Sequence, residues 1–96
     1  MEELRLLDEV TLLCPKCGGA FLHQYEIEVW IRQKEDADEG AHVLVSKSVV
    51  SENKNMEGNP SLRRDGLSIS FACENCDGVH KLIVIQHKGS TFLKWG

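Results

Sequence analysis

Two short stretches, Cys14-Pro15-Lys16-Cys17 and Cys73-Glu74-Asn75-Cys76, contain all four cysteines of this 96-residue chain. Two tight pairs of thiolates are the ligand pattern of a tetrahedral metal site, in which zinc is the usual ion. Because residues 18–72 separate the pairs, one ion would join two distant parts of the chain. The sequence therefore predicts one structural Zn²⁺ bound by four residues. The predicted ligands are Cys14, Cys17, Cys73 and Cys76.

The residues around the first pair favour a metal site over the alternatives. Pro15 presets φ for a turn, and Gly18 and Gly19 tolerate the positive φ that usually follows the second ligand. Iron in the same thiolate cage stays open, because tetrahedral sulfur sites accept either metal. A redox-active pair or disulfides also stay open. However, a redox pair usually needs a following helix to lower the thiol pKa, and we find none after Cys17.

Strand patterns dominate the first half of the chain. Apolar and polar residues alternate over residues 21–32, which predicts a long strand with one dry face. His23 falls on that face and is expected to be a hydrogen-bonded core histidine. Residues 33–40 are expected to form a solvated, charged loop, and residues 41–50 a second strand that pairs with the first.

The second half adds a loop and a hairpin. Residues 51–66 are rich in Asn, Gly and Pro and predict a loop, after which residues 67–72 alternate as a strand that leads into Cys73. Lys88 and Gly89 predict a two-residue turn that pairs Ile85 with Phe92. Both faces of this hairpin are apolar, so we expect it in the centre of the sheet, covered on both sides.

These patterns predict an all-β fold, a zinc ribbon with an extended antiparallel sheet and an inserted hairpin, as a single domain over residues 1–96. The chain has no run of 18 apolar residues and its N-terminus lacks the apolar core of a signal peptide. Reduced cysteines fit a reducing compartment, so we expect a cytoplasmic protein.

Enzymatic activity is not expected from the motifs. Four thiolates close the coordination shell of zinc and leave no position for a reactive water. No pair among His23, His42, His80 and His87 shows ligand or acid–base spacing, and no nucleophile or phosphate-binding motif occurs. His80, close to the second cysteine pair, is a candidate for an outer-shell contact or an alternate ligand.

Charge disfavours nucleic acid as the partner. The net charge is −4, and Zn²⁺ with four thiolates adds −2 to give −6. Residues 1–50 carry ten acids against five bases, whereas residues 51–96 carry five acids against six bases. Binding to phosphates needs basic surface, so only the second half could supply a patch. Its members would be Arg63, Arg64, Lys81, Lys88 and Lys94.

Two functions from different classes fit these observations. The first is a protein-interaction module with an unknown protein partner, with a homodimer through a free strand edge as a further arrangement. The second is a nucleic-acid-binding zinc ribbon accessory to transcription or DNA handling. Five residues are candidate contacts for a partner or nucleic acid, because they are basic, aromatic or placed at a hairpin tip. They are Trp30, Arg63, Arg64, His87 and Lys88. For Trp30 the alternative is a place in the core, covered by the inserted hairpin.

Several short motifs extend beyond the cysteines: CPKCGG at 14–19, GNPS at 58–61, RRDG at 63–66, CENC at 73–76 and QHKGST at 86–91. With these motifs the chain resembles a group of small bacterial and phage- or mobile-element-encoded zinc-ribbon proteins. The resemblance implies bound zinc and a mobile-element origin. A mobile-element origin would in turn imply an adaptor that targets host machinery. It assigns no catalytic residues.

Overall fold

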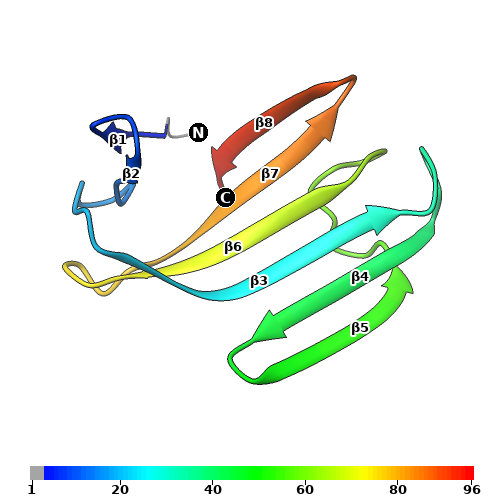
Figure 1. Cartoon of the computed structure of the whole chain (residues 1–96), viewed down its shortest axis with the longest axis horizontal. Coiled ribbons are helices and arrows are strands. Elements are labelled where there is room, and N and C mark those ends of the chain that lie inside the picture. Colours follow the sequence, from blue (N-terminus) through cyan, green and yellow to red (C-terminus); the bar gives the residue numbers. More distant parts are fainter. Residues whose placement is uncertain (1–3) are drawn as a thin grey trace.

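The computed structural model describes residues 4–96 and confirms an all-β fold. Eight strands form two antiparallel sheets, one of two strands and one of six (Figure 1). The strands are β1 (Leu6–Leu7), β2 (Thr11–Leu12), β3 (Leu22–Arg32), β4 (Glu39–Ser46), β5 (Val49–Asn55), β6 (Gly66–Cys73), β7 (Val79–His87) and β8 (Ser90–Trp95). Within residues 4–96 no helix has the length and apolarity that crossing a membrane requires.

The six-stranded sheet consists of two three-stranded meanders joined side by side. Its order is β5-β4-β3-β6-β7-β8, and β3 pairs with β6 at the centre. The small β1–β2 sheet lies off the end of the large sheet where β3 and β7 begin (Figure 1). This arrangement brings the segment after β2 close to the turn between β6 and β7, where the two cysteine pairs lie.

A β-bulge in β3 changes which residues face each side of the sheet. The register with β6 shifts between Gln24 and Glu26, so Tyr25 is the extra residue. Beyond the bulge Ile27 lies opposite Ile69, whereas before it His23 lies opposite Ala72 on the other face. The prediction of His23 as a core residue is therefore wrong: its side chain is exposed and lies 3.3 Å from a Glu74 oxygen.

Residues 41–55 form two strands where the sequence predicted one strand and part of a loop. The turn at Lys47 and Ser48, with φ of 57° at Lys47, divides β4 from β5. Val45 pairs with Val50 and Ser46 with Val49, so β5 folds back on β4 and becomes the outer edge. Its polar residues, including those predicted as loop, tolerate this because an edge strand is exposed to water.

The β7–β8 hairpin has the predicted register but a different place in the sheet. Ile85 pairs with Phe92, and Lys88 and Gly89 have φ of 49° and 82°, as a two-residue turn of the primed type requires. However, β8 is the second edge of the sheet, so the expectation of a central hairpin is wrong. The centre consists of β3 and β6, because β3 pairs with β4 on one side and with β6 on the other.

The segment of residues 56–65, which we call the crossover segment, passes over one face of the sheet from β5 to β6. The indole Nε1 of Trp30 donates to the Glu57 carbonyl at 2.9 Å, and the Ser61 hydroxyl donates to the Gln86 carbonyl at 3.2 Å. Pro60 lies so close to Gly66 that a side chain there would clash. The crossover segment therefore buries Trp30, which is 3% exposed.

The sheet has little core of its own. The principal extents are 39 × 32 × 19 Å, so the molecule is thin in one direction. In residues 4–96 the buried apolar side chains are those of Cys14, Trp30, Phe71 and Cys73. Two of these four are cysteines of the predicted metal site, so a metal ion there would be bound by half of the buried apolar residues.

Candidate metal centre

The two cysteine pairs occupy turns with the same backbone geometry. In the first, the Gly18 amide donates to the Cys14 carbonyl at 2.9 Å, and in the second the Asp77 amide donates to the Cys73 carbonyl at 3.2 Å. Gly18 and Asp77 hold equivalent positions and both have positive φ, 75° and 56°. Each turn is closed by the amide of its first cysteine, which donates at 2.8 Å to a glycine carbonyl, Gly19 or Gly78. Both turns therefore present two sulfurs in the same way.

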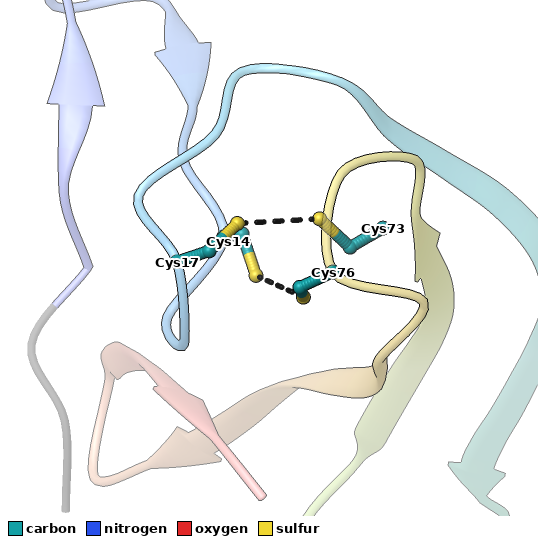
Figure 2. A group of neighbouring side chains, drawn as sticks. All are labelled: Cys14, Cys17, Cys73 and Cys76. Atoms are coloured by element: carbon teal, nitrogen blue, oxygen red, sulfur yellow. Dashed lines mark hydrogen bonds between the residues drawn. The ribbon is translucent and has the colours of Figure 1, made fainter.

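The four sulfurs converge on one point between the turns (Figure 2). Cys14 Sγ lies 3.8 Å from Cys76 Sγ, and Cys17 Sγ lies 3.5 Å from Cys73 Sγ. All four sulfurs lie within 4.8 Å of one another. A tetrahedral ion with Zn–S bonds of about 2.3 Å sets its sulfurs about 3.8 Å apart, so the cage has the size that zinc needs.

The same distances exclude disulfides. All four cysteines are free thiols, and a disulfide would need sulfurs at about 2.05 Å. The arrangement also differs from that of a redox-active CxxC pair, because the short sulfur–sulfur contacts, Cys14 to Cys76 and Cys17 to Cys73, join one turn to the other. The structure therefore confirms that the predicted ligands Cys14, Cys17, Cys73 and Cys76 form one cluster suited to a metal ion.

The four neighbouring thiols oppose one another's ionisation. The Cys76 and Asn75 amides lower the pKa of the Cys73 thiol to about 7. The Gly78 amide acts in the same direction on Cys76, but burial and the neighbouring thiols raise its pKa to about 12. Ionising one thiol therefore makes the next harder to ionise, and a divalent cation would relieve this repulsion.

Two side chains support the cluster from outside. His80 Nε2 lies 3.4 Å from Cys14 Sγ, and Arg5 Nη2 donates to the Cys14 carbonyl at 3.2 Å. His80 does not belong to the group of mutually close ligand atoms among residues 4–96. It therefore occupies the outer-shell position predicted as one alternative, where it can hydrogen-bond to the sulfur of Cys14.

Metal binding should weaken as the pH falls, because protons compete with the ion for the thiolates. The cage is ready for metal when its thiols are deprotonated, so affinity is highest at alkaline pH and declines steadily as the pH falls through about 7, the pKa of the Cys73 thiol, and below. A titration of Zn²⁺ against a competing indicator dye at pH 8, 7, 6 and 5 measures this change. An affinity equal at pH 8 and pH 5 would contradict thiolate ligation, and a change of salt at fixed pH serves as the control.

Two of the predicted contact residues form ion pairs with acidic residues of the same chain. Arg63 makes two hydrogen bonds to the Asp36 carboxylate, at 2.6 and 2.9 Å, and Arg64 lies 2.7 Å from a Glu35 oxygen. The Arg63 guanidinium holds the pKa of Asp36 below its usual value. The loop at residues 33–40, predicted as solvated, therefore supplies the ion-pair partners of these arginines. Only long-range packing brings the two segments together.

The other predicted contacts divide between interior and surface. Trp30 stacks on His42 with ring centroids 5.0 Å apart under the crossover segment. Trp30 is buried, which fits the core position weighed for it and does not support its use as a contact residue. His87 and Lys88 are exposed at the end of the β7–β8 hairpin, as their place at a tip predicted.

His87 and Arg63 share an open apolar hollow of about 330 Å³, which we call the partner hollow. Leu62 is 91% exposed at its border, and the His87 and Phe92 rings lie 6.3 Å apart. The sequence did not indicate it, because the crossover segment forms one wall and the β7–β8 hairpin the other. Its lining residues are Pro60, Ser61, Leu62, Arg63, Ile85, His87 and Phe92.

Comparison of the chain with models of protein families, with curated proteins and with solved structures gives no match.

Proposed function

We propose that this chain is a non-catalytic protein-binding module stabilised by one structural Zn²⁺. The convergence of four free thiols on a tetrahedral cage carries the metal assignment. Sulfur ligands select soft or borderline ions, and four of them fill the shell of zinc, so no position is left to activate water. Iron is the alternative ion for the same cage. Four reduced thiols also support a reducing compartment such as the cytoplasm.

The charge distribution supports a protein partner over nucleic acid. A phosphate-binding surface needs free Arg and Lys side chains, because displaced counterions supply most of the affinity. Here Arg63 and Arg64 are engaged by Asp36 and Glu35 of the same chain. The net charge of −4 adds long-range repulsion for a polyanion.

The partner hollow supports a docking site for an apolar side chain. Its walls are apolar at Ile85, Phe92 and Pro60, and Arg63 and His87 add polar groups at its border. A peptide that inserts one apolar or aromatic residue there would cover Leu62, which is otherwise exposed. The sequence motifs extend this proposal to a mobile-element adaptor with a host protein as its partner, and that extension rests on the motifs alone.

Nucleic-acid binding and peptide binding can be tested side by side. We expect labelled DNA and RNA to bind with Kd weaker than about 10⁻⁴ M at physiological salt. We expect a displayed peptide library to yield ligands rich in aromatic residues, and L62D or F92D to weaken them at least about 10-fold by placing a charge in the hollow. The matched control is V49D, an exposed apolar residue of β5 far from the hollow.

Each outcome decides between the two functions. Tight binding of nucleic acid that falls steeply between 50 and about 200 mM salt would reject the protein-binding proposal. Peptides that bind wild type and L62D equally would reject the hollow as the site. Loss of peptide binding in L62D and F92D but not in V49D would support it.

A further inference from the structure

The strand register places one apolar residue of every strand in a row across the sheet. Residues directly opposite in neighbouring strands point to the same face, so the members of this row share one face. In sheet order they are Val50, Val45, Ile27, Ile69, Leu82 and Trp95.

A second row lies two residues along each strand on the same face. It consists of Val43, Val29, Leu67, Val84 and Leu93. On β5 the row ends in Glu52, which lies opposite Val43 at the border. We call the apolar residues of these two rows the apolar face; the one charged side chain in the rows is Glu52 at the border. Such a surface is typical of the interior of a β-sandwich, in which a second sheet covers it.

The chain leaves much of the apolar face exposed to water. Val45, Val50 and Leu93 are exposed, and the hollow beside Val29, Leu67 and Val84 has a volume of about 220 Å³. The crossover segment cannot cover it, because it packs on the opposite face, where Trp30 lies opposite Gly66. Exposed apolar patches above a few hundred Å² are rare in monomeric proteins.

We propose that a second copy of this chain covers the apolar face, so that two sheets pack face to face as a β-sandwich. Six strands at about 4.8 Å spacing and about 14 Å of strand length, the span of the two rows, give a projected face of about 400 Å² in each copy. Burial in both copies is about 800 Å² before the relief of the side chains is added, which raises it toward the roughly 1,000–1,200 Å² of a small specific interface.

The uncharged character of the face favours a copy of the chain as its occupant. A twofold axis presents the same apolar surface to itself, so neither copy buries an unpaired charge. Glu52 lies on the edge strand β5, where it stays in contact with water. This dimer differs from one formed through strand edges, because the backbone groups of β5 and β8 stay free. It also leaves the partner hollow open, since Ile85 and Phe92 lie on the other face.

Neighbouring residues on the two edge strands provide a matched test. Val50 and Val49 are both 64% exposed, and Leu93 and Phe92 are 52% and 51% exposed, but each pair points to opposite faces. We expect the wild type to sediment as a dimer at micromolar concentration. V50K/L93K should raise the dimer Kd at least about 100-fold, because four lysines would enter an apolar interface. V49K/F92K should remain a dimer.

The outcomes separate this proposal from its competitors and from the proposed function. A monomeric wild type at about 100 μM would overturn it, since the proposal expects a dimer already at micromolar concentration. Equal dissociation of V50K/L93K and V49K/F92K, or a dimer that survives V50K/L93K, would also overturn it and indicate pairing through an edge. Circular dichroism checks folding, and if V50K/L93K has lost its β-sheet signal, V50K alone provides the comparison. Peptide binding by the V50K/L93K monomer would show that the partner hollow works without the dimer.

Discussion

Replacing Cys14 with serine should remove the bound Zn²⁺ and the cooperative thermal transition together. Cys14 is fully buried, and its sulfur contacts Cys76 and His80. A structural zinc site contributes about 10–16 kcal/mol in finger peptides, whereas a small domain has a net stability of only about 5–15 kcal/mol. This chain has few other buried apolar side chains, so loss of the ion should unfold it or loosen it severely. Elemental analysis and a thermal melt followed by circular dichroism measure the two effects.

The neighbouring residue provides the control for this substitution. Lys16 lies in the same turn, but it contacts Cys14 Sγ through its backbone amide at 3.4 Å and its side chain is exposed. K16A should therefore keep one equivalent of metal and a melting temperature within a few degrees of wild type. Chelation of the wild-type protein should reproduce the effect of C14S, and added Zn²⁺ should reverse it. A metal-free C14S protein with an unchanged cooperative melt would show that the cage is not structural.

Truncating Trp30 to alanine should lower the free energy of unfolding by about 3–5 kcal/mol, the usual cost for a buried aromatic side chain. Trp30 fills the space between the sheet and the crossover segment and also stacks on His42. Its removal leaves a cavity and leaves the Glu57 carbonyl without its indole donor. The midpoint of urea unfolding, taken with metal bound, measures the loss. The expected change is a large fraction of the total stability of a small domain.

A phenylalanine at the same position separates the contribution of packing from that of the hydrogen bond. W30F keeps most of the packing but removes the hydrogen bond to Glu57, so it should cost about 1–3 kcal/mol. L62A, which truncates a nearby side chain that is almost fully exposed, should change stability by less than about 0.5 kcal/mol. A W30A protein as stable as L62A would mean that the crossover segment does not pack on the sheet as described.

Features set by local chemistry could be predicted from the sequence alone. The two CxxC turns need only their own residues to point sulfurs inward, and the spacing therefore indicated the cage before the fold was known. The alternation over residues 21–32 indicated β3. The turn at Lys88 and Gly89 fixed the pairing of Ile85 with Phe92, because a two-residue turn determines the register of its hairpin.

Features set by contacts between distant segments were decided by the tertiary structure. The bulge at Tyr25 moved His23 to the other face, although the alternation of the sequence is uninterrupted there. The pairing of β3 with β6 put the apolar β7–β8 hairpin at the edge and left an apolar face uncovered. The pairing of Arg63 with Asp36 and the burial of Trp30 also depend on where the crossover segment lies. Sequence patterns report which residues prefer water or turns, but strand order and register depend on the summed free energy of many long-range contacts.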